Sequence, residues 1–136
     1  MSSPTDQYEA ITHGIHVIVQ PCYLEEESEP QDNQFVWAYT VQIANRGTET
    51  VQLRDRYWRI IDANGHMEEV SGEGVVGEQP TISPGEHYQY TSGCPLPTPS
   101  GIMAGNYSME LGDGSMIEVD IPAFSLDLPG ARTIVN

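Results

Sequence analysis

The sequence predicts an all-β fold, an antiparallel β-sandwich of about seven strands. Short segments in which apolar and polar residues alternate recur along the chain, and this is the period of a half-buried strand. Thirteen glycines and ten prolines separate these segments, as tight turns between short strands require. No window shows a convincing 3.6-residue helical period. Strands joined only by turns and loops favour a two-sheet sandwich of immunoglobulin or fibronectin type III character.

The first half of the chain supplies the clearest strands. Residues 15–24 alternate, and Pro21, which has no N–H to donate, indicates a sheet edge or a bulge. Residues 35–43 place large apolar side chains at strict alternation, which predicts a central strand. Residues 51–62 are rich in β-branched and aromatic side chains and predict the strand after it.

The second half of the chain is more broken. Asn64-Gly65 predicts a type I′ hairpin turn, because both central positions of that turn need positive φ. Residues 112–115 predict a second hairpin turn. The remaining strands are expected at residues 66–70, 86–92, 107–111 and 116–126.

The chain length of 136 residues fits one domain. We expect a frayed or disordered segment at residues 1–12, one sandwich domain at 13–128 and a tail at 129–136. The sequence shows no signal peptide and no apolar run that could span a bilayer. Cys22 and Cys94 lie far apart and lack metal-ligand spacing, so we expect free thiols in a cytoplasmic protein, with a long-range disulfide as the alternative.

The net charge of −15 limits the partners that the chain can take. It disfavours nucleic acid and anionic membranes, whose binding depends on Lys and Arg, and this chain has only five Arg and no Lys. It allows basic proteins, polyamines and weak divalent-cation association, or it serves solubility alone. The acidic segment 25–33 lacks the fixed spacing of a calcium loop, so we expect no defined metal site and no cofactor.

Gly72, Gly74 and Gly77 form a G-x-G-x-x-G pattern. In dinucleotide-binding proteins this motif opens a helix, whereas here Pro80 follows and the flanking residues are acidic. These features argue against a Rossmann site. Two readings stay open: an anion nest of backbone N–H groups, or glycines that permit positive φ in a sharp connection.

The wider sequence around this motif resembles the signature of the ApaG family. The matching segments are residues 57–60, 72–80, 84–85, 90–93, 103–107 and 121–126, and the resemblance covers about residues 8–130. It implies a small bacterial protein with a fibronectin type III-like sandwich. Similar domains are appended to eukaryotic F-box proteins and to a polymerase-delta-interacting protein, where they are thought to mediate protein contacts. The resemblance also implies a link to cobalt resistance and magnesium efflux, and it supplies no catalytic residues.

Arg54, Arg56 and Trp58 are the candidate protein-interaction residues, because Arg and aromatic side chains are enriched at interface hot spots. The alternative is that the arginines pair with carboxylates within the sheet. The sequence contains no recognisable catalytic constellation, so we expect a non-enzymatic binding or adaptor module, linked through its family to cobalt and magnesium homeostasis. The alternative is a regulator that binds a nucleotide, pyrophosphate or a divalent cation, with Gly72, Gly74 and Gly77 as its site. An exposed sheet edge would also permit a homodimer.

Overall fold

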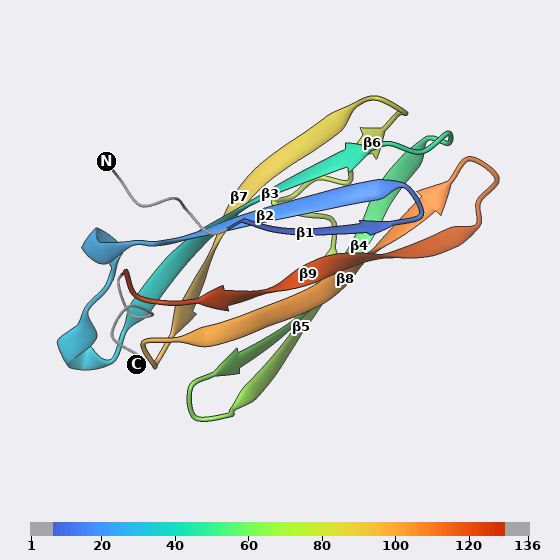
Figure 1. Ribbon diagram of the computed structural model, residues 1–136. Helices are drawn as coiled ribbons and strands as arrows, with labels where there is room; N and C mark the ends of the chain where they lie inside the picture. The colour runs from blue at the N-terminus through green and yellow to red at the C-terminus, as the bar shows by residue number, and fades with distance from the viewer. Residues whose placement is uncertain (1–6, 130–136) are drawn as a thin grey trace, which may run out of the picture.

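The computed structural model describes residues 7–129 and confirms the sandwich of two antiparallel sheets (Figure 1). No α-helix occurs in this range, and two short 3-10 helices, η1 (Glu25–Glu27) and η2 (Pro30–Asp32), occupy the acidic segment. The strands are β1 (Tyr8–Thr12), β2 (Ile15–Tyr23), β3 (Phe35–Asn45), β4 (Val51–Asp62), β5 (Met67–Glu73), β6 (Thr81–Ile82), β7 (His87–Leu96), β8 (Gly101–Leu111) and β9 (Met116–Leu126).

One sheet has the strand order β1-β2-β3-β7, and the other has β5-β4-β8-β9 with the short β6 also paired to β4. The two sheets approach each other along one side, where the Asp120 N–H donates to Thr12 Oγ1 at 3.2 Å. Pro21 lies beyond the reach of β1, whose pairing with β2 ends at Val19. Its missing N–H therefore faces an unpaired edge, as the sequence predicts.

The core lies between the sheets, and β3 shows why the sequence folds this way. Every second residue from Phe35 to Asn45 is buried, so the alternation of the sequence becomes the two faces of a central strand. An aromatic cluster between the two sheets joins them within the core. The ring centroids of Tyr39 and Trp58 lie 5.3 Å apart, and Phe124 packs against both.

Residues 7–129 form nine strands where about seven are predicted. Residues 8–12 are strand β1 and not part of a frayed segment, because they pair antiparallel with residues 15–19 of β2. Residues 1–6 and 130–136 lie outside the described range, so the expectations for the chain ends stay predictions there.

A β-bulge in β4 changes the faces that simple alternation predicts for this strand. The register with β8 shifts between Leu53 and Asp55, which leaves Arg54 as the extra residue. Leu53 and Trp58 are therefore both buried, although alternation from the sequence places them on opposite faces.

The predicted type I′ turn at Asn64-Gly65 is wrong. Only Gly65 has positive φ, and the Gly65 N–H donates to the carbonyl of Asp62 at 3.0 Å. This is a three-residue hairpin loop that ends in a left-handed glycine, and the β8–β9 hairpin repeats it with Gly114. Type I′ geometry does occur at His13-Gly14, where both φ angles are positive.

Cys22 and Cys94 are both free. Strand β3 separates them, since Cys22 pairs with Ala38 and Cys94 pairs with Trp37. Cys22 is exposed and Cys94 is buried, so the alternative of a long-range disulfide is excluded. Across residues 7–129, no helix has the length and apolar character needed to cross a membrane.

Candidate binding surfaces

The three predicted interaction residues serve the fold. Trp58 is only 3% exposed and packs in the core, so its proposal as a surface contact residue is corrected. Arg54, at the bulge, pairs with Glu110 on the neighbouring strand at 2.7 Å. Arg56 faces the interior side of β4, because it shares a face with Trp58 after the bulge. The cross-strand alternative therefore accounts for Arg54.

Arg56 organises the glycine-rich segment. Its Nη1 donates to the carbonyl oxygens of Glu73 at 3.0 Å and Gly74 at 2.8 Å. Gly72 lies directly opposite Arg56 on β5, and a Cβ there would meet the guanidinium at 3.0 Å. Glycine at this position leaves room for the arginine to reach the loop.

The glycine-rich segment is a tight hairpin in which the N–H groups of Gly74, Val75 and Glu78 donate to backbone carbonyls. Val75 and Glu78 exchange backbone hydrogen bonds across Val76-Gly77, and both central φ angles are positive, which defines a type I′ turn. The Gly74 N–H donates to the carbonyl of Arg54 at 2.8 Å. An anion nest needs several free N–H groups that converge, so this geometry favours the structural reading of the glycines.

An exposed apolar row crosses the outer face of the second sheet. Ile61 of β4 pairs with Met67 of β5 on one side and with Ile102 of β8 on the other, so the three side chains share one face. Met67 is 51% exposed and Ile102 is 48% exposed, whereas Ile61 between them is half-buried. We call Met67, Ile61 and Ile102 the apolar row.

Polar and aromatic groups border the apolar row. Arg59, two residues from Ile61 on the same face, is exposed and lies opposite Glu69. Tyr57 follows along the strand and donates to Glu69 Oε2 at 2.5 Å, which raises the pKa of the Tyr57 hydroxyl. Beyond Tyr57 the surface forms a hollow of about 420 Å³ that carries the exposed carboxylates of Asp55 and Glu73.

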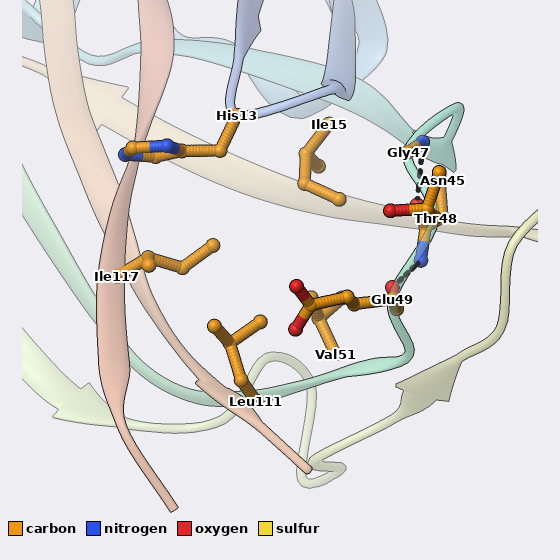
Figure 2. Close-up of a pocket in the computed structure, with 9 residues that line it drawn as sticks. All are labelled: His13, Ile15, Asn45, Gly47, Thr48, Glu49, Val51, Leu111 and Ile117. Carbon is orange, nitrogen blue, oxygen red and sulfur yellow. Dashed lines mark hydrogen bonds between the residues drawn. The ribbon is translucent and has the colours of Figure 1, made fainter. Parts of the chain in front are cut away.

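A recess lies at the opposite end of β4 and β8, where the β1–β2 turn, the β3–β4 loop and the β8–β9 hairpin come together (Figures 1 and 2). Its volume is about 220 Å³. The lining residues are His13, Ile15, Asn45, Gly47, Thr48, Glu49, Val51, Leu111 and Ile117.

Among the histidines, His16 has a carboxylate partner. Its Nε2 lies 2.7 Å from Glu9 Oε1, and this hydrogen bond lowers the pKa of the Glu9 carboxyl. His16 is buried on the outer face of the first sheet between Ile11 and Ala44, its cross-strand neighbours. Neither neighbour can act as a nucleophile. Within residues 7–129, no group of three or more His, Cys, Asp or Glu side chains is arranged to hold a metal ion.

The apolar row and the end recess both draw residues from strands that are distant in the sequence. Sequence reasoning missed them because each strand contributes only one or two members. To predict the apolar row, one would need to know the register of β4 with both of its neighbouring strands, β5 and β8. The apolar residues Ile61 and Ile102 are visible in the sequence, but nothing local there indicates that they meet.

The two packed antiparallel sheets define an all-β sandwich domain of the fibronectin type III kind. The family model described as the ApaG domain matches residues 25–111. Protein ApaG of Brucella anthropi is 61% identical over 95% of this chain and 99% of its own length. Protein ApaG of Brucella canis is 58% identical over the same shares. The chain therefore belongs to the ApaG family.

A solved structure agrees with this assignment. The crystal structure of the putative ApaA protein from Bordetella pertussis superposes with a TM-score of 0.83 at 44% sequence identity. The match covers 93% of this chain and 98% of that one. The fibronectin-like sandwich that the sequence resemblance implies is thus confirmed by the fold and by a solved relative.

Proposed function

We propose that this ApaG-family chain is a non-enzymatic protein-binding module whose contact surface is the outer face around the apolar row. The observation that supports the proposal is the row itself. Three neighbouring strands each place one large apolar side chain on a solvent-facing sheet surface, and the two outer ones are about half exposed. Arg59 and Tyr57 beside the row are residue types enriched at interface hot spots.

The partner that fits this surface has an apolar patch with basic residues around it. Glu69 on β5 flanks the row, and Asp55 and Glu73 carry the negative charge further along the same face of the sheet. A second copy of this chain fits poorly, because it would bring another net charge of −15 to the same interface. We therefore propose a different protein as partner, and a monomer in its absence.

The absence of catalysis and of a cofactor is part of the same proposal. The His16–Glu9 pair has apolar cross-strand neighbours, and the amides of Gly74, Val75 and Glu78 in the glycine-rich hairpin donate within the protein. The free thiols of Cys22 and Cys94 fit a reducing compartment, so we propose a cytoplasmic location.

We propose that the family's link to cobalt and magnesium acts through the partner protein. Titration of this chain alone with MgCl₂ or CoCl₂ at millimolar concentration should then leave its melting temperature unchanged.

The experiment begins by finding what the row touches. A photo-crosslinking amino acid is placed at Arg59 in the full chain, and the crosslinked protein is identified by mass spectrometry from cells that express it. The Kd of the purified partner is then measured for the wild type and for the double variant Met67→Ser/Ile102→Ser. We expect the double variant to weaken binding by roughly tenfold or more, because truncated hot-spot side chains cost about 1–2 kcal/mol each.

A matched control comes from the same chain. Ile11→Ser/Met116→Ser removes one exposed isoleucine and one exposed methionine, at 62% and 48% exposure, from outside the row. It should leave the Kd unchanged. Equal weakening by the two double variants, or a crosslink to a second copy of this chain, would overturn the proposal.

A further inference from the structure

The end recess has an apolar floor formed by both sheets. Ile15 of β2 and Val51 of β4 are buried at 1% and 2% exposure, and Leu111 and Ile117 of the β8–β9 hairpin complete the wall as half-buried side chains. Figure 2 shows these four side chains converging on the recess. Such a floor favours the aliphatic part of a ligand, because burying it removes apolar surface from water.

One carboxylate projects over this floor. Figure 2 shows the Glu49 side chain pointing into the recess above Val51 and Leu111. Across residues 7–129, the Glu49 carboxylate has no ion-pair partner, and the two ion pairs present lie elsewhere, at His16–Glu9 and Arg54–Glu110.

The backbone of Glu49 is held firmly in place. Asn45, which is 1% exposed, donates from Nδ2 to the carbonyl of Glu49 at 2.8 Å and to that of Ile82 at 2.9 Å. Its Oδ1 accepts from the Gly47 N–H at 2.9 Å. The β3–β4 loop is therefore pinned around the recess, and the backbone from which the Glu49 side chain projects is held in place by the fold.

The recess is of a size for one side chain. An engineered cavity of about 150 Å³ in another protein holds a single benzene, whereas this recess measures about 220 Å³. A purely apolar occupant would cover the Glu49 carboxylate without pairing it, which carries a desolvation penalty. An anionic occupant would face both this carboxylate and the net charge of −15.

We propose that the end recess binds a lysine side chain from a basic segment of a partner protein. The four-carbon stem of lysine packs on the floor formed by Ile15, Val51 and Leu111, and its ammonium pairs with Glu49 at the rim. The Thr48 hydroxyl, on the same loop, offers a further acceptor for the three ammonium donors. The recess lies at the opposite end of β4 and β8 from the apolar row, so this inference does not depend on the row being a contact surface.

The test uses a short capped peptide with one lysine between glycine and serine residues. Methyl NMR on the full chain follows Ile15, Val51, Leu111 and Ile117 during titration. We expect saturable shifts at these methyl groups in the millimolar range. The same peptide with norleucine in place of lysine keeps the stem, lacks the charge and should not bind. Glu49→Gln should weaken the lysine peptide roughly three- to fivefold, the usual effect of losing one exposed ion pair.

Three further measurements decide between the sources of binding. Glu27→Gln removes the same charge from the acidic segment and should leave the affinity unchanged, so equal weakening by the two substitutions would overturn the proposal. Equal binding of the norleucine peptide would also overturn it. Tighter binding of free 1,5-diaminopentane than of the peptide would make the occupant a small polyamine and not a protein lysine. The Met67→Ser/Ile102→Ser variant should keep the peptide affinity, so failure of the row as a contact surface is distinguishable from failure of the recess.

Discussion

Arg56 Nη1 donates a hydrogen bond of 2.8 Å to the carbonyl oxygen of Gly74, and so connects the middle of strand β4 to the glycine-rich hairpin. A second bond from the same nitrogen reaches Glu73 at 3.0 Å. Within residues 7–129, Arg56 is the positive side chain that contacts the glycine motif, and its Nη1 donates to backbone carbonyl oxygens there. The motif is thus explained by how one arginine closes a hairpin.

Replacing this arginine should loosen the hairpin. We expect Arg56→Ala to lower the free energy of unfolding by about 2 kcal/mol, because hydrogen bonds that involve a charged group contribute about 1.5–3 kcal/mol. Urea denaturation followed by tryptophan fluorescence measures the change. Arg46→Ala removes the same charge from an exposed position and should stay within about 0.5 kcal/mol of the wild type. Equal losses in the two variants would show that net charge, and not the hydrogen bonds, sets the stability.

The hydroxyl groups of Tyr90 and Tyr107 form a buried hydrogen bond of 2.5 Å between the two sheets. Tyr107→Phe leaves the Tyr90 hydroxyl without its partner and should cost about 1–3 kcal/mol of unfolding free energy. The double variant Tyr90→Phe/Tyr107→Phe removes both polar groups and should cost less than the sum of the two single variants. A double-mutant cycle from chemical denaturation measures this coupling, and strictly additive losses would contradict it.

Strands with strict alternation could be predicted from the sequence, because their burial follows the two-residue period. Strand β3 shows this, with every second residue from Phe35 to Asn45 buried. Strand β1 could not, because residues 8–12 are half-buried or exposed and carry a weak pattern. In β4 a single extra residue, Arg54, reverses the faces that follow it, and nothing local in the sequence indicates a bulge there.

The candidate surfaces were harder to predict for the same physical reason. Arg56 and Trp58 are conspicuous in the sequence, yet the bulge turns both toward the interior side of the sheet. Ile61 and Arg59, their neighbours, face outward and border the proposed contact surface. Whether an arginine beside an aromatic residue is a contact residue or a structural one thus depended on one residue of register.

Burial of ionisable groups predicts a loss of stability at alkaline pH. Burial raises the pKa of the Cys94 thiol from its ordinary value of 9.0 to about 11, and it also raises the pKa of Tyr39 and Tyr107. Between pH 9 and 11 the unfolded chain has released a proton from Cys94 that the folded chain retains. Unfolding is therefore favoured as the pH rises, and Cys94 alone should account for about 2 kcal/mol by pH 11.

Thermal unfolding between pH 8 and 11 measures this dependence. Cys94→Ala should flatten the decline above pH 9, whereas Cys22→Ala, which removes the exposed thiol, should leave the slope unchanged. A thiol reagent at pH 8 should modify Cys22 in the folded protein and reach Cys94 only after denaturation. Parallel slopes in the two variants would contradict the prediction.

Val76 is the one residue of the glycine-rich hairpin whose side chain opposes its backbone. Its φ is 43°, in the left-handed region that a β-branched residue rarely adopts, and it occupies the first central position of the type I′ turn. Because its side chain is 55% exposed, replacement loses little apolar burial. Val76→Asn should therefore raise the free energy of unfolding by about 1 kcal/mol, since asparagine tolerates this conformation.

Gly77→Ala provides the opposite test of the same turn. Gly77 has a φ of +82° and open space around an added Cβ, so the substitution introduces only backbone strain and should destabilise by about 1 kcal/mol. Denaturation curves of the two variants should thus move in opposite directions from the wild type. A destabilised Val76→Asn would mean that the valine side chain stabilises the hairpin through contacts that outweigh its unfavourable φ. If the Val76→Asn variant binds the partner of the apolar row with an unchanged Kd, the glycine-rich hairpin lies outside the contact surface.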